Sequence, residues 1–158
     1  YERLVVIRRP VRYILNMWDL PGSLELRPMW RLFWAWTNVE TCVWVQNAND
    51  RASVPENQAL LSQLCQDDGL RFSEIIVVLN IHNPNDITRI KPEEYTKTLL
   101  EIPTIARRVQ DNNLYVIELN AKDRKDLSTF KDMLCTQRTL NQEEEKLTSL
   151  GFPAVVAE

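Results

Sequence analysis

Three short, continuous apolar runs most constrain the fold of this chain. They are Thr41–Val45, Ile75–Leu79 and Leu114–Leu119, and helical patterns lie between them. Runs of this kind are typical of strands that are buried on both faces, as in a parallel sheet covered by helices. The alternation of such strands with helices predicts a single α/β domain with a mainly parallel sheet.

Two further strands are predicted at the start of the chain. Arg3–Arg9 contains the apolar run Leu4–Ile7, and Val11–Trp18 follows it directly. The connection between the two is short and basic and contains Pro10, which is typical of a tight turn. The sequence therefore predicts a hairpin ahead of the parallel sheet.

A helix is predicted between the first and second of the three runs. Ser53–Glu56 has the pattern of a capping box with proline in the first turn, and Gly69 is expected to stop the helix. Other helices are expected where an apolar stripe follows proline or acidic residues. Three such helices are expected. One begins at Lys91–Glu94, the next has an apolar stripe of Leu127, Phe130 and Leu134, and the last contains Glu143–Glu145.

Composition limits the classes of partner. The chain has 158 residues and a formal net charge of −3, so it lacks the basic excess that is typical of nucleic-acid binding. Apolar runs such as Ile75–Leu79 are far too short to span a bilayer, and no signal peptide is visible. We therefore expect protein partners, with no nucleic acid and no transmembrane segment.

The residues that usually bind metals are sparse. Cys42, Cys65 and Cys135 lack the spacing of a metal or redox motif, so buried thiols in a reducing compartment are expected. His82 is the single histidine, which excludes a multi-histidine site. With only three glycines, no glycine-rich phosphate loop can be drawn. No metal site is expected, and the cytoplasm and the mitochondrial matrix fit the chain equally well.

The most specific motif follows the predicted hairpin. Trp18–Ser23 reads W-D-L-P-G-S, and Arg27–Arg31 reads R-P-M-W-R. Together they resemble the W-D-x-G-G-Q and R-P-x-W-R elements of the Arf family of small GTPases. The resemblance continues through Phe33, Thr37 and Asn49–Arg51.

This resemblance implies an Arf/Ras-like α/β fold, with a mainly parallel sheet flanked by helices and an antiparallel interswitch hairpin. It covers residues 1–137 and leaves residues 138–158 as a C-terminal extension. In the family, the first strand and the phosphate loop G-x-x-x-x-G-K-[ST] precede the residues that match Tyr1. The chain is therefore expected to lack the cradle for the β- and γ-phosphates. The empty strand position is expected to be filled by upstream sequence, by a partner's strand or by residues 152–157.

The resemblance also assigns roles in the switch-two motif. Asp19 occupies the position of the family's aspartate that helps to hold Mg²⁺. Gly22 occupies the position of the glycine whose backbone N–H donates to the γ-phosphate. Ser23 replaces the glutamine that orients the attacking water, and it is too short for that task. Pro21 replaces the first glycine, which removes an N–H and stiffens the segment. Catalysis by the usual mechanism is therefore not expected.

A second set of residues corresponds to the guanine-reading loops. Asn83 and Asp86 fall on the family's N-K-x-D motif, but Pro84 replaces the lysine that packs on the base. Ala121 and Lys122 fall on the S-A-K loop, where a backbone N–H meets guanine O6 and the lysine covers the base. We interpret these residues as the remnants of a nucleotide site. For Asn83 and Asp86 a role as turn formers is the alternative.

Aromatic residues suggest where a partner binds. Trp18 and Phe33 match two members of the effector-binding patch of Arf proteins, and Arg3 falls on the third position. Trp30 is a further candidate for partner contact, because large aromatic side chains often anchor interfaces. The alternative is a packing role, which applies to Trp30, Trp34 and Trp44.

The leading hypothesis is a catalytically inactive Arf-like pseudo-GTPase that serves as a structural or interaction subunit of a larger assembly, without a cofactor. It rests on the losses at Pro21, Ser23 and Pro84 and on the missing phosphate loop. The rival hypothesis is a divergent Arf-like GTPase that binds GTP or GDP with Mg²⁺ and whose phosphate loop lies upstream of this sequence. Such an enzyme would hydrolyse GTP very slowly because of Ser23.

Overall fold

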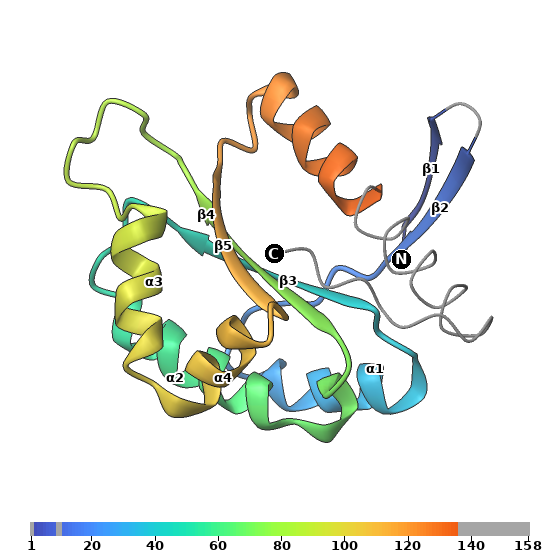
Figure 1. Ribbon diagram of the computed structural model, residues 1–158, viewed down its shortest axis with the longest axis horizontal. Helices are drawn as coiled ribbons and strands as arrows, with labels where there is room; N and C mark the ends of the chain where they lie inside the picture. The colour runs from blue at the N-terminus through green and yellow to red at the C-terminus, as the bar shows by residue number, and fades with distance from the viewer. Residues whose placement is uncertain (1, 9–10, 136–158) are drawn as a thin grey trace. The chain divides into compact units, whose positions relative to one another are not determined.

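The computed structural model describes residues 2–8 and 11–135, which divide into two compact units (Figure 1). The first unit comprises described residues up to Leu20 together with residues 123–135, and the second is Pro21–Lys122. Three predictions lie outside the described residues: the helix at Glu143–Glu145, the extension 138–158, and the filling of a strand position by residues 152–157.

The first unit contains the predicted hairpin. Strands β1 (Glu2–Arg8) and β2 (Val11–Met17) pair antiparallel, from Glu2 opposite Met17 to Arg8 opposite Val11. This confirms the strand and hairpin predictions. Residues 124–135 of the same unit are helical, with Leu127, Phe130 and Leu134 partly buried, as the apolar stripe predicts.

The second unit contains a parallel sheet in the order β3-β4-β5, formed by Thr41–Asn47, Glu74–Asn80 and Leu114–Leu119. β4 lies in the middle, and its residues Ile75–Leu79 are at most 1% exposed. The predicted α/β class, the parallel sheet and the buried central strand are thus confirmed.

The expectation that β3 is buried on both faces is wrong. Val43 and Val45 are 39% and 62% exposed, whereas Cys42 and Trp44 pack against the core. Among the described strands β3 pairs only with β4, so it is an edge strand of this sheet. A continuous apolar run therefore did not distinguish the edge strand from the central one.

Helices α2 (Val54–Gln66), α3 (Pro92–Leu100) and α4 (Pro103–Gln110) cover one face of this sheet (Figure 1). The core between the helices and the sheet joins alternate residues of β4 to one face of each helix. Its buried members are Ala48, Leu61, Ile75, Val77, Leu79, Ile90, Tyr95, Leu99, Ile105 and Leu114.

Two helical segments were not predicted individually. A 3-10 turn, Arg27–Met29, leads into the short helix α1 (Trp30–Trp36), and α4 follows α3 after a brief turn. α4 turns Ile105 and Arg108 inward, and the Arg108 guanidinium donates to the carbonyls of Leu70 and Ser73 at 2.8 and 2.9 Å. Because a charged residue occupies a buried position of α4, the apolar pattern by which a helix is recognised in sequence is interrupted there.

The two ends of α2 differ from the expected caps. Ser53 does not cap the helix through its side chain, because its hydroxyl donates to the carbonyl of Asp50 at 3.1 Å. The Asp50 carboxylate accepts from the N–H groups of Ala52 and Ser53 instead. At the other end the helix stops at Gln66, before Gly69. The helix and Ser53 as its N-cap residue are confirmed, whereas the side-chain bond of a capping box and the stop at Gly69 are wrong.

Burial of titratable groups in this core makes the fold sensitive to alkali. Burial raises the pKa of Cys42 to about 11 from 9.0, that of Cys65 to about 11, and that of Tyr95 to about 12. The neutral forms are favoured in the folded state, so this stability is complete below about pH 9 and is lost as the pH rises through 11.

We expect the free energy of unfolding in urea, measured with a reductant, to fall between pH 8.5 and pH 10.5. Cys42 alone contributes a loss of about 2 kcal/mol, because the unfolded state ionises first. The variant Cys42→Ala should show a correspondingly smaller fall. A free energy that is constant across this range in the unsubstituted protein would contradict the prediction.

Candidate functional site

The candidate site lies at the carboxyl ends of β3, β4 and β5, in the second unit. Asn49, in the loop after β3, holds the loop after β4. Its side-chain oxygen accepts from the N–H groups of His82 and Asn83 at 3.0 and 3.1 Å. Its side-chain nitrogen donates to the Asn83 carbonyl at 3.1 Å and to the Asp86 carboxylate at 2.9 Å. Asn49 therefore fixes this loop through four hydrogen bonds, which we call the Asn49 latch.

Asp86 is bonded within its own loop. One carboxylate oxygen accepts from the Asn49 amide at 2.9 Å. The other accepts from the N–H and the hydroxyl of Thr88 at 2.9 and 2.7 Å. These hydrogen bonds hold the pKa of Asp86 below its ordinary value, and the bond from Asn49 has the largest effect. The carboxylate is therefore ionised at neutral pH.

The turn after β5 is held in a similar way. Asn80, the last residue of β4, accepts from the N–H of Ala121 at 3.1 Å. The N–H of Lys122 donates to the Asn120 side chain at 2.9 Å. The structure thus brings Ala121 beside Asn80, a residue that sequence reasoning did not single out.

Asn83 acts as a turn former in this loop. Its side-chain oxygen accepts from the N–H of Asn85 at 3.1 Å, and its own N–H belongs to the Asn49 latch. Asn49 was noted only as part of the Asn49–Arg51 triplet. Its position directly after a strand was the available signal for a role at the sheet edge.

The switch-two segment, Pro21–Trp36, belongs to the same unit and is anchored at its start. The indole N–H of Trp30 donates to the carbonyl of Pro21 at 2.9 Å. Arg27 donates from Nε to the carbonyl of Gly22 at 3.0 Å and from Nη1 to Glu56 of α2 at 2.8 Å. Ser23 is exposed. The segment that carries Gly22 and Ser23 is therefore tied to α2.

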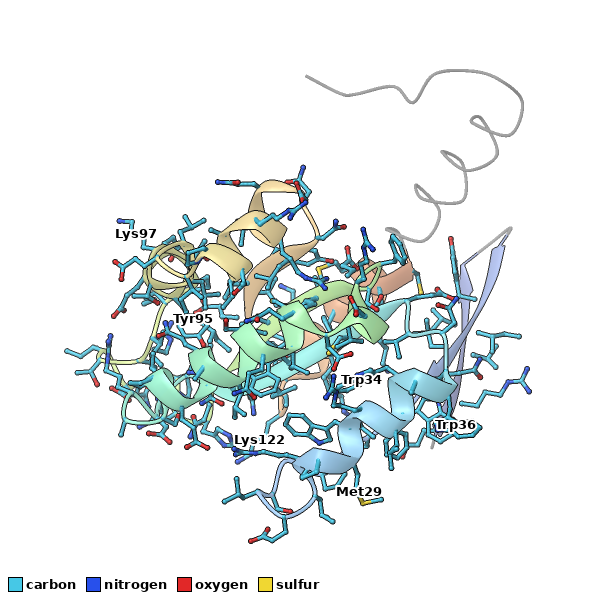
Figure 2. The ribbon with its side chains drawn as sticks, turned by 90° about the horizontal axis from the view of Figure 1, so that it is seen from below. Met29, Trp34, Trp36, Tyr95, Lys97 and Lys122 are labelled. Carbon is cyan, nitrogen blue, oxygen red and sulfur yellow. The ribbon has the colours of Figure 1, made fainter. Side chains whose placement is uncertain are left out.

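Helix α1 makes further contacts within the unit. Arg31 pairs with Asp67 at 2.9 Å, and the rings of Trp30 and Trp44 meet edge to face with centroids 6.0 Å apart. Figure 2 shows Trp34 on the side of α1 that faces α2. There its ring lies so close to Gly69 that an added Cβ would be 2.5 Å from Trp34 Cδ1.

The outer side of α1 carries exposed apolar side chains. Met29, Leu32 and Trp36 are 47%, 55% and 85% exposed, and Figure 2 shows Met29 on the side of the helix opposite Trp34. We call these three residues the α1 ridge. Their spacing of three and four residues along a helix was a signal in the sequence, but the phase of the helix was not known.

Among the predicted partner-binding residues, Trp30 and Phe33 are partly buried, and Trp18 is 51% exposed. Trp18 and Asp19 follow β2 in the first unit, and Asp19 is exposed. The described part of the chain contains no cluster of three or more metal-binding side chains. Within that part, too, no helix has the length and apolar character needed to cross a membrane.

Comparison with known proteins decides the family. The profile of the ADP-ribosylation factor (Arf) family matches residues 9–138, well over half of the chain. The chain belongs to the Arf family. ADP-ribosylation factor-like protein 3 of Caenorhabditis elegans is 28% identical to it over 85 residues, which are 54% of this chain and 44% of that protein. The chain thus spans less than half of that relative's length.

Family membership confirms the resemblance that the switch-two motif predicted, and the Arf/Ras-like fold with it. Arf-family proteins are small GTPases. By analogy with the guanine-binding motifs of Arf proteins, the Asp86 carboxylate and the N–H of Ala121 are the groups expected to contact guanine. Here both are engaged in hydrogen bonds to the chain itself, with Asn49, Thr88 and Asn80.

Proposed function

We propose that this Arf-family chain is an interaction module, inactive as a GTPase, that serves as a subunit of a larger protein assembly. The observation that carries the proposal is the anchoring of switch two. Arg27, Trp30 and Arg31 link it to Glu56, Trp44 and Asp67, and the α1 ridge is exposed. A switch that responds to GTP must move, whereas these contacts favour one position.

The sequence at the nucleotide site supports the same proposal. Ser23 replaces the glutamine that orients water, Pro21 stiffens the segment, and Pro84 replaces the base-packing lysine. The bonds that Asp86 makes to Asn49 and Thr88 give it a structural task that needs no base.

A slow GTPase is the second candidate function, because other Arf-family proteins bind and hydrolyse GTP. Asp86 is ionised and Ala121 lies at the same sheet edge, which supports this candidate. This candidate requires GTP or GDP with Mg²⁺ to change the affinity for a partner. The interaction module requires that nucleotide has no effect.

A binding experiment with a matched control separates the two. The chain is immobilised on a resin and incubated with an extract of cells that make it. Each incubation contains Mg²⁺ and either GDP or a non-hydrolysable GTP analogue. We expect Trp36→Ser to reduce capture of its protein partner at least tenfold, because exposed tryptophans often anchor interfaces. Phe72→Ser, at a side chain that is 92% exposed, should leave capture unchanged.

Equal capture with both nucleotides is expected for the interaction module. Capture that depends on the nucleotide would favour the slow GTPase. If Trp36→Ser and Phe72→Ser reduced capture equally, the α1 ridge would not be the binding surface. Urea unfolding of both variants verifies that they remain folded.

A further inference from the structure

A buried arginine of α4 lies where three backbone carbonyls converge. Arg108 is only 9% exposed. Its Nη1 donates to the carbonyl of Ser73 at 2.9 Å, and its Nη2 donates to the carbonyls of Leu70 and Cys65 at 2.8 and 3.4 Å. We call these three hydrogen bonds the Arg108 clamp. The clamp joins α4 to the segment that runs from the end of α2 to the start of β4.

The acceptors of the clamp are carbonyls, and in the described part of the chain no carboxylate pairs with Arg108. Cys65 lies in the last turn of α2, where carbonyls have no partner within the helix and attract a cation. A planar guanidinium can donate to several such carbonyls at once. An apolar side chain could fill the same space, but it would remove a donor from all three carbonyls.

The segment that the clamp holds also contacts α1. Gly69 belongs to the 3-10 turn η2 (Asp68–Leu70), and the ring of Trp34 lies directly against it. Just before this turn, the Asp67 carboxylate pairs with Arg31 of α1 at 2.9 Å. A displacement of η2 would therefore displace α1 as well.

Ser73 provides a second link between the clamp and α1. It is 2% exposed, and its hydroxyl donates to the carbonyl of Val39, in the loop that follows α1. The N–H of Ser73 donates to the carbonyl of Leu70 at 3.1 Å, and this carbonyl is also an acceptor of Arg108. Both links to α1 thus converge on one guanidinium group.

We propose that Arg108 is a positioning residue for the α1 ridge. Its guanidinium fixes η2 and Ser73, and these in turn set the place and rotation of α1, so that the ridge stays exposed. The consequence for partner binding rests on the proposed function. Without the clamp, α1 would adopt the binding orientation for only part of the time, and the apparent affinity would fall by that fraction.

A contact measured by NMR in the free protein tests the positioning directly. The nuclear Overhauser effect between Trp34 Hδ1 and the Hα protons of Gly69 should be strong, because the ring lies against this residue. In Arg108→Ala we expect this effect to fall at least about twofold, since the contact is then populated for only part of the time. Arg107→Ala is the matched control, at a side chain of the same helix that is 85% exposed. It should leave the effect unchanged.

Rescue by a small cation separates the clamp from a general loss of packing. Arg108→Ala removes the atoms of an ethylguanidinium group, so added ethylguanidinium can donate to the same carbonyls. We expect it to restore the effect, whereas ethylammonium has the charge without the planar fork and should not restore it. Arg108→Lys keeps a charged stem and should show the same loss, which provides the test if Arg108→Ala does not fold.

An unchanged effect in the folded Arg108 variants, or equal restoration by both cations, would overturn the proposal. Partner capture then measures the consequence for binding, and we expect Arg108→Ala to reduce it about tenfold while Arg107→Ala has no effect. If Trp36→Ser reduced capture and Arg108→Ala did not, the positioning role would be wrong. If Trp36→Ser had no effect, the proposed function would fail. The contact between Trp34 and Gly69 would still decide whether Arg108 positions α1.

Discussion

Substitution of Gly69 by alanine is expected to destabilise the second unit by about 1–3 kcal/mol, the usual range for an overfilled contact. The new Cβ would lie 2.5 Å from Trp34 Cδ1 and 3.3 Å from Trp34 Cγ. The indole ring must move, and α1 must then loosen from η2 (Asp68–Leu70). Urea unfolding followed by tryptophan fluorescence measures both the loss of stability and the change around Trp34.

Gly22→Ala is the matched control for this substitution. It makes the same chemical change, here within the switch-two segment, but its Cβ would meet no atom within 4 Å. We expect its stability and fluorescence to equal those of the unsubstituted protein. If Gly69→Ala were neutral, or if both variants lost the same stability, the contact between Trp34 and Gly69 would not be what positions α1.

The second large effect is expected at the Asn49 latch. Asn49→Ala removes four hydrogen bonds and leaves Asp86 without its amide donor. Because the loop is partly exposed, water replaces some of these bonds, and we expect a loss of about 2 kcal/mol. Hydrogen exchange should increase at the amides of His82 and Asn83. Asn85→Ala, at an exposed neighbour in the same loop, should have little effect.

Asn49→Asp tests the same latch by charge. This variant keeps an acceptor for the N–H groups of His82 and Asn83, but it places a second carboxylate beside Asp86. Repulsion raises the pKa of one of the two carboxyls in the folded state, so the penalty is largest at neutral pH and shrinks as the pH falls below about 5. A penalty that is independent of pH would show that Asp86 does not face residue 49.

Local patterns were sufficient for much of the fold. The apolar runs located β3, β4 and β5, and the hairpin followed from two short runs joined by a basic turn. Cap chemistry was less predictable, because Asp50 and Ser53 are both good capping residues. The choice between them depends on the backbone of the loop, in which Ser53 already has helical dihedral angles.

The candidate site was only partly visible in the sequence. Asp86 and Ala121 were found through motifs, since a motif preserves residue type and spacing. Their partners Asn49 and Asn80 are 37 and 41 residues away in the chain, and hydrogen bonds over such separations exist only after the strands are aligned in register. The latch therefore had no signature in any short segment.

The switch-two motif shows the same division most clearly. By itself, the sequence determined the Arf family and the α/β class, because W-D-x-x-G and R-P-x-W-R are local and specific. Only the tertiary structure decided which side chains of α1 face outward. A helix of seven residues has no strong phase of its own, and packing of Trp34 beside Gly69 and of Trp30 against Trp44 sets its rotation. That rotation leaves Met29, Leu32 and Trp36 exposed to solvent.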